Sequence, residues 1–200
     1  PDGTRDQGGN RFWNATETCC DFGRTGVDDL AYLTGLIDEA VERLNVDPER
    51  VYLAGHSNGG FMASRIACDA ADKVTAILSI AGSEFSDPER CRPSRPVGLI
   101  QVHGTLDSTI AYAGGRFRGG GSYPGAETVA TRFFAHNNCP DQPAAVSAAD
   151  FDRGVLGEET EVTVWGGCDN GADVQLWSMQ GSGHVPGFTD DFRDALVETL

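Results

Sequence analysis

Apolar residues recur at spacings of three and four along the stretch 27–44. This spacing places them on one side of an α-helix, which is predicted to be amphipathic. The same pattern predicts helices over 126–138 and 192–200, and a further helix over about 60–71. Four helices are therefore expected, spread along the whole chain.

Continuous apolar runs predict buried strands at 51–54, 74–80 and 97–102. Alternating apolar residues at 162–164 and 174–176 predict two more strands. Continuous runs separated by helices are typical of a mostly parallel sheet covered by helices on both faces. The pattern therefore predicts an α/β fold.

Two stretches show neither pattern and are predicted to be irregular. Residues 114–125 are rich in glycine, and residues 140–159 are mainly polar or small. Loops at the carboxyl ends of parallel strands border ligand sites, so the first stretch is either a mobile rim around a pocket or an ordinary solvent loop. The chain of 200 residues suits one domain over 1–200.

A Gly-x-Ser-x-Gly sequence lies between the first predicted strand and the helix that follows it, with Gly55 and Gly59 around Ser57. Strand, sharp turn and helix form the context of a nucleophile elbow. A serine hydroxyl becomes a useful nucleophile when such a turn exposes it beside a base. Ser57 is therefore the candidate nucleophile. The alternative is a glycine-rich turn whose serine only caps the helix.

A serine nucleophile needs a base and an acid that orients the base, and in α/β-hydrolases they follow in the order Ser, Asp or Glu, His. Asp107 lies just beyond the predicted strand 97–102 and is the preferred acid. Asp87 is the competing acid, one strand earlier and inside a Ser-Asp-Pro turn. The uninterrupted apolar strand before Asp107 fixes its position better than the Ser-Asp-Pro turn fixes the position of Asp87.

His184 is the candidate general base, because it lies in a glycine-rich loop after the last predicted strand. The other histidines are interpreted as structural. His56 is inside the elbow, His103 ends a buried strand, and His136 lies on a helix before a cysteine.

The backbone N–H of Asn58 is predicted to form one half of an oxyanion hole. The second donor should come from an earlier strand-to-helix loop, and no such loop is found between Pro1 and the elbow. We therefore expect either that the domain is incomplete at its N-terminus or that another segment donates.

The charge of the chain argues against several partners. Thirty acidic and 15 basic residues give a formal net charge of -15, which repels nucleic acid and anionic membranes. No stretch approaches the roughly 20 apolar residues that a membrane helix requires. Membrane insertion and nucleic-acid binding are therefore not expected, and the oligomeric state is left open.

Six cysteines without a Cys-x-x-Cys pair favour disulfides and an oxidising compartment over a metal site. A bridge from Cys139 to Cys168 would close a loop of about 30 residues and contribute on the order of 3–4 kcal/mol. Adjacent Cys19 and Cys20 are not expected to bond to each other. The connectivity among these two cysteines, Cys68 and Cys91 is undetermined, and free buried thiols are the alternative.

Motifs over most of the chain resemble the polyhydroxybutyrate depolymerase and feruloyl esterase branch of the α/β-hydrolases. The matching positions are Pro1-Asp2-Gly3, Trp13-Asn14, Cys19-Cys20, Val27-Asp28-Asp29, Val51 through Ala63, Cys91, His103 through Asp107, Gly114-Gly115, Cys139, Cys168 and Gly183-His184. The resemblance implies a secreted serine esterase without a cofactor or metal, with Ser57, Asp107 and His184 as its triad.

The chain departs from this family in two places. A His-Gly oxyanion loop usually precedes the Pro-Asp-Gly segment and is absent here, and Val185 stands before Pro186 where the family tends to have tryptophan. The substrate is expected to be a hydroxyalkanoate polyester or a feruloylated or acetylated polysaccharide. A serine peptidase on the same fold and a non-catalytic binding domain are the rival functions.

Overall fold

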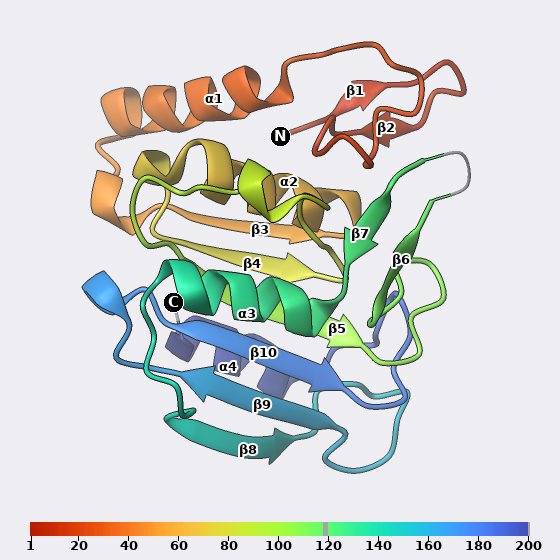
Figure 1. The fold of residues 1–200 in the computed structure, drawn as a ribbon, viewed down its shortest axis with the longest axis vertical. Helices are drawn as coiled ribbons and strands as arrows, with labels where there is room; N and C mark the ends of the chain where they lie inside the picture. The colour runs from red at the N-terminus through yellow and green to blue at the C-terminus, as the bar shows by residue number, and fades with distance from the viewer. Residues whose placement is uncertain (118–119, 200) are drawn as a thin grey trace.

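A six-stranded sheet forms the centre of the protein (Figure 1). The computed structural model describes residues 1–117 and 120–199. The strands lie in the order β3-β4-β5-β10-β9-β8. Their bounds are β3 Tyr52–His56, β4 Ala76–Ile80, β5 Gly98–Gly104, β8 Ala145–Ala149, β9 Thr160–Trp165 and β10 Val174–Met179.

The sheet is mostly parallel, as the apolar runs predict. Strands β3, β4, β5 and β10 run parallel to one another, whereas β9 runs antiparallel to both β10 and β8. The parallel strands share one carboxyl edge, which is where ligand sites form in open α/β sheets.

Four α-helices accompany the sheet, at the places that the apolar spacing predicts. They are α1 Asp29–Leu44, α2 Asn58–Asp69, α3 Ala126–His136 and α4 Asp190–Thr199. In Figure 1, α2 and α3 cover the near face of the sheet, α4 lies behind it, and α1 lies beyond α2. Short 3-10 turns occur at Pro48–Arg50, Ala71–Lys73, Pro88–Arg90 and Asp169–Gly171.

Alternate residues of the central strands β4, β5 and β10 contribute to apolar clusters on opposite faces of the sheet. Leu99 packs with Phe61 of α2 and Phe133 of α3 on one face. Ile100, the next residue of β5, packs with Phe192 of α4 on the other. Burial on both faces explains why this strand reads as a continuous apolar run. The chain therefore has an α/β fold with helices on both faces.

Both stretches predicted to be irregular contain strands. β8 lies within 140–159, and a hairpin of β6 (Gly114–Arg116) and β7 (Ser122–Pro124) lies within 114–125. The expectation was wrong for β8 because its short side chains are largely exposed at the sheet edge, so pairing with β9 defines the strand and hydrophobicity does not. A second hairpin, β1 (Thr4–Arg5) with β2 (Arg11–Phe12), also carried no alternating signal.

The six cysteines form three pairs. Cys139 is joined to Cys168, as predicted, and Cys68 is joined to Cys91. The expectation that Cys19 and Cys20 do not bond to each other was wrong. The peptide between these two residues is cis, and their Cα atoms lie 3.0 Å apart.

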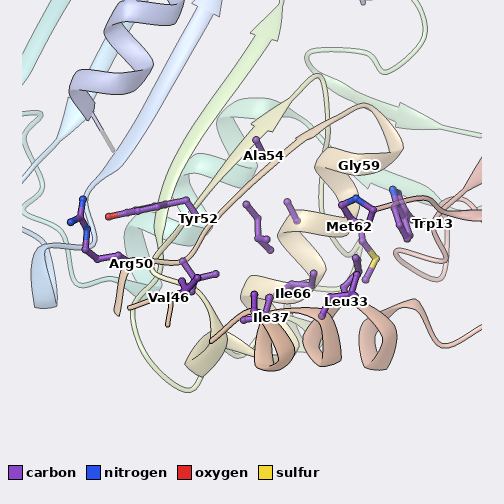
Figure 2. A pocket seen from close by; sticks show the side chains of 16 residues that line it. Trp13, Leu33, Ile37, Val46, Arg50, Tyr52, Ala54, Gly59, Met62 and Ile66 are labelled. Carbon is purple, nitrogen blue, oxygen red and sulfur yellow. The ribbon is translucent and has the colours of Figure 1, made fainter. Parts of the chain in front are cut away.

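An apolar groove separates α1 from the edge of the sheet (Figure 2). The cavity has a volume of about 590 Å³, and Leu33 and Ile37 of α1 face Met62 and Ile66 of α2 across it. Asp29 is the only buried residue of α1. No strand among the described residues pairs with the outer edge of β3. Among these residues, too, no helix combines the length and hydrophobicity needed to cross a bilayer.

Candidate active site

Ser57 occupies the sharp turn between β3 and α2. Its backbone lies in the left-handed region, with φ 55° and ψ −120°, which a non-glycine residue rarely adopts. Ser57 makes no side-chain cap to α2, which disagrees with the interpretation of this serine as a simple helix cap. Strain of this kind is found where a side chain must be held exposed for function.

Gly55 and Gly59 differ in what surrounds them, although the motif makes them look equivalent. A Cβ atom at Gly55 would overlap the backbone carbonyl of Gly59, whereas a Cβ atom at Gly59 meets nothing within 4 Å. Gly55 is therefore required by the close approach of strand and helix, and Gly59 is not.

We expect Gly55→Ala to lower the free energy of unfolding by about 2–4 kcal/mol, since backbone must shift to admit the methyl group. Gly59→Ala is the matched control and should change it by less than about 1 kcal/mol. Urea unfolding followed by circular dichroism measures both. Equal losses in the two variants would contradict this account of the turn.

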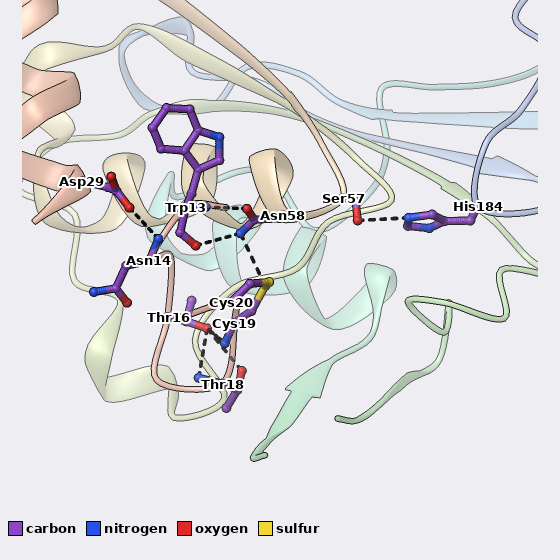
Figure 3. Close-up of a disulfide and its surroundings, with 10 residues drawn as sticks. All are labelled: Trp13, Asn14, Thr16, Thr18, Cys19, Cys20, Asp29, Ser57, Asn58 and His184. Atoms are coloured by element: carbon purple, nitrogen blue, oxygen red, sulfur yellow. Dashed lines mark hydrogen bonds between the residues drawn. A yellow bond between two sulfur atoms is a disulfide. The ribbon is translucent and has the colours of Figure 1, made fainter. Parts of the chain in front are cut away.

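His184 brings its ring between Ser57 and Asp107. Its Nε2 lies 3.0 Å from Ser57 Oγ, as Figure 3 shows, and its Nδ1 lies 2.7 Å from Asp107 Oδ2. An ionised carboxylate only accepts hydrogen bonds, so Nδ1 carries the hydrogen and Nε2 can accept from the serine hydroxyl. The three residues predicted from chain order are thus in direct contact.

The Asp107 carboxylate is fully buried and densely hydrogen-bonded. Its Oδ1 accepts from the N–H groups of Thr109 and Ile110, at 2.8 and 2.9 Å. Burial acts to raise the pKa of Asp107, but hydrogen bonds from His103, His184 and these two amides outweigh it and hold the pKa well below its usual value. Asp107 is therefore ionised throughout the neutral range.

Asp87, the competing acid, has a different role. It precedes the 3-10 turn Pro88–Arg90, and its Oδ1 accepts from the N–H of Glu89 at 2.9 Å. It is therefore a turn-capping residue. The preference for Asp107 over Asp87 agrees with this geometry.

Asp152 holds the loop that carries His184, and the sequence did not single it out. Its Oδ2 accepts from Ser182 Oγ at 2.7 Å, and its Oδ1 accepts from the N–H of Gly187 at 2.9 Å. These contacts lie on both sides of His184 in the chain. Asp152 belongs to the stretch predicted to be irregular, and nothing in its local pattern indicated a partner some 30 residues away.

Replacing Asp152 with alanine is expected to lower kcat by roughly tenfold, because the loop loses two hydrogen bonds to a buried charged group. Steady-state kinetics with a small soluble ester measures the effect. The exposed Asp150 provides the control, and Asp150→Ala should keep wild-type kcat. A wild-type rate in Asp152→Ala would show that the loop needs no such support.

The three histidines interpreted as structural lie in different surroundings. His56 is exposed, and its Nε2 lies 2.8 Å from the backbone oxygen of His184, so it also contacts the His184 loop. His136 is half-buried on α3, where burial and then the nearby Arg132 lower its pKa. His103 is buried beside Asp107, with Nε2 3.3 Å from Oδ2.

The side chain of Asn58 binds the segment before the Cys19–Cys20 pair (Figure 3). Its Oδ1 accepts from the N–H of Trp13 at 2.6 Å, and its Nδ2 donates to the Trp13 carbonyl at 2.9 Å. Asn58 is also the first residue of α2, and the first N–H groups of a helix have no partner within it.

One cluster has the composition of a metal site. The ligand atoms of Cys68, Glu84 and Cys91 lie within 4.8 Å of one another. Both cysteines are joined in a disulfide, and Glu84 pairs with Arg132 at 3.0 Å. In this state the cluster offers no thiolate to a metal ion.

Similar proteins are esterases. The chain is 30% identical over 164 residues to feruloyl esterase D of Neurospora crassa, covering 82% of this chain and 49% of that protein. It is 29% identical over 182 residues to feruloyl esterase B of Piromyces equi, covering 88% and 31%. It is 27% identical over 165 residues to a bifunctional acetylxylan esterase/xylanase of Neocallimastix patriciarum, covering 82% and 22%. The chain thus spans half or less of each of these relatives, and no family profile matches it.

Solved structures show the same fold. The acetyl xylan esterase from Aspergillus awamori aligns with a TM-score of 0.59 at 13% identity, over 86% of this chain and 68% of that one. Esterase PE8 aligns with a TM-score of 0.54 at 19% identity, over 85% and 60%.

The chain therefore has the α/β-hydrolase fold. Its homologues are feruloyl esterases and acetylxylan esterases, which confirms the resemblance seen in the sequence.

Proposed function

We propose that this protein is a serine carboxylic ester hydrolase that works through an acyl-enzyme. The observation that carries the proposal is the continuous contact from Ser57 Oγ through the His184 ring to the Asp107 carboxylate, at 3.0 and 2.7 Å. This arrangement allows the base to take the serine proton while the acid stabilises the resulting imidazolium.

In the proposed reaction, His184 Nε2 takes the hydroxyl proton while Ser57 Oγ attacks the ester carbonyl. The carbonyl oxygen becomes an oxyanion, which the N–H of Asn58 and the positive end of α2 would stabilise. His184 then gives its proton to the departing alcohol and leaves an acyl group on Ser57. His184 then takes a proton from water, which attacks the acyl group on Ser57, and the carboxylic acid is released.

A second oxyanion donor is needed for full activity, and we propose that it comes from a segment not described here. The outer edge of β3 pairs with no described strand, and an apolar groove lies between this edge and α1. The relatives are also longer than the chain. Further strands placed against β3 would complete the domain and bring a loop to Ser57. The absence of one donor would lower turnover by about 10²–10³.

The proposed substrates are feruloyl or acetyl esters of polysaccharides. The named activities of the homologues support this class. The hydroxyalkanoate polyesters of the sequence-based expectation find no counterpart among these names. The net charge of -15 disfavours nucleic acid as a partner.

We also propose that the protein works outside the cell. All six cysteines lie in pairs, and disulfides persist in oxidising compartments.

A substrate panel tests the proposed activity. The full-length protein, with any residues that precede Pro1, is assayed on methyl ferulate, p-nitrophenyl acetate, a hydroxybutyrate dimer and a peptide p-nitroanilide. We expect hydrolysis of the first two esters and none by a Ser57→Ala variant. Cleavage of the anilide alone would favour a serine peptidase, and no turnover of any compound would favour a binding domain.

A further inference from the structure

His103 is a buried imidazole that contacts the candidate acid without contacting the nucleophile. It lies on β5 with 2% of its surface exposed, four residues before Asp107. Its Nε2 lies 3.3 Å from Asp107 Oδ2, the same oxygen that accepts from His184 Nδ1. Two imidazoles therefore share one carboxylate oxygen, and only one of them belongs to the proposed triad.

The hydrogen on His103 Nε2 follows from its neighbours. This nitrogen lies 2.8 Å from the backbone oxygen of Ile110 as well as 3.3 Å from Asp107 Oδ2. A carbonyl oxygen and an ionised carboxylate both only accept hydrogen bonds. Nε2 must therefore carry a hydrogen, which it donates to the Ile110 carbonyl with the Asp107 carboxylate close beside it.

Gln101 determines the state of the other ring nitrogen. Its side-chain Nε2 lies 3.2 Å from the backbone oxygen of Gly82 and 3.4 Å from His103 Nδ1. Because the Gly82 carbonyl can only accept, the amide must present its NH₂ group to that side. The same NH₂ group then faces His103 Nδ1, which accepts and carries no hydrogen. The surroundings thus favour the neutral imidazole.

The remaining group that faces His103 does not change this conclusion. The ring of Tyr112 meets the His103 ring edge-on, with centroids 5.8 Å apart. The Tyr112 hydroxyl bonds to Ser178 Oγ at 2.7 Å, and burial raises the pKa of this phenol, so it stays neutral. Among the described residues, Asp107, with His184 behind it, is then the only charged group in contact with His103.

We propose that His103 is a positioning residue for Asp107, held neutral by Gln101, in the reaction proposed above. Its Nε2–H is directed to the Ile110 carbonyl and lies beside Oδ2, where it places a partial positive charge next to the carboxylate without adding a full one. Neutrality matters because an imidazolium at His103 would compete with His184 for the same negative oxygen. The full charge of Asp107 is then available when His184 takes the proton of Ser57.

Two variants separate positioning from packing. His103→Leu fills the site but donates no hydrogen bond, whereas His103→Gln retains an N–H donor near the place of Nε2. With p-nitrophenyl acetate, we expect His103→Leu to lower kcat by roughly tenfold to a hundredfold and to leave KM within about twofold. His103→Gln should recover most of the lost kcat. Equal losses in both variants, or no loss in His103→Leu, would overturn the proposal.

The tautomer is measured separately in the wild-type protein, so the test survives if a variant does not fold. Two-bond correlations between imidazole ring hydrogens and nitrogens should show the His103 hydrogen on Nε2 and none on Nδ1. A doubly protonated ring, or a hydrogen on Nδ1, would overturn the proposal. If the wild-type protein hydrolyses no ester at all, the proposed function fails, while the spectrum still decides the state of His103.

Discussion

Ser57→Ala is expected to lower kcat for ester hydrolysis by about a millionfold, to the level that binding alone provides. The variant loses the hydroxyl that contacts His184 Nε2, so no acyl-enzyme can form. The fold should persist, because Ser57 makes no side-chain cap to α2 and alanine adds no atoms.

The matched control for this variant is Ser64→Ala. Ser64 lies on α2, the helix that follows Ser57; it is fully buried and has a hydroxyl without a hydrogen-bond partner among the described residues. Ser64→Ala should keep the wild-type kcat. Its free energy of unfolding should stay within about 1 kcal/mol of the wild-type value. Initial rates on p-nitrophenyl acetate and thermal unfolding decide both points. If Ser57→Ala retained a tenth of the wild-type rate, Ser57 would not be the nucleophile.

Asp107→Asn is expected to lower kcat by about 10⁴. The N–H groups of Thr109 and Ile110 donate to Oδ1, and they would keep the amide oxygen of asparagine on their side. The new NH₂ group would then face His184 Nδ1 and donate to it. This places the His184 hydrogen on Nε2, where it blocks acceptance of the Ser57 proton.

Asp87→Asn provides the comparison, since both residues were candidate acids. Asp87 caps the turn Pro88–Arg90, so this change should leave kcat within about twofold and affect stability only slightly. Rates are compared at one pH near neutrality, where Asp107 is ionised in the wild-type protein. A larger loss of kcat in Asp87→Asn than in Asp107→Asn would reverse the assignment of the acid.

The elements that position the site could be predicted because they bury large apolar faces. β5 is buried along its whole length, so its apolar run was visible, and Asp107 follows it directly. Chain order then selected His184, and the structure brings it into contact with both Ser57 and Asp107. Local pattern and the known chemistry of serine hydrolases were sufficient to find these three residues, because each of them follows the end of a strand.

Other features depend on contacts between distant residues and left no local signal. Asp152 supports the His184 loop through Ser182 and Gly187. The sequence does not distinguish His103 from the other three histidines, because its role depends on its neighbours in the fold. β8 exists through backbone pairing with β9, and no apolar face marks it. The Cys19–Cys20 pair required a cis peptide, which the residues alone did not indicate.

Covalent labelling tests the central claim most directly. The full-length protein is treated with diethyl p-nitrophenyl phosphate, which phosphorylates a serine only where a neighbouring base activates it. Peptide mass spectrometry then locates the adduct. We predict a single diethylphosphoryl group on Ser57, and none in the Ser57→Ala protein. An adduct on any other residue, or a wild-type protein that stays unlabelled, would contradict the claim that His184 and Asp107 activate Ser57.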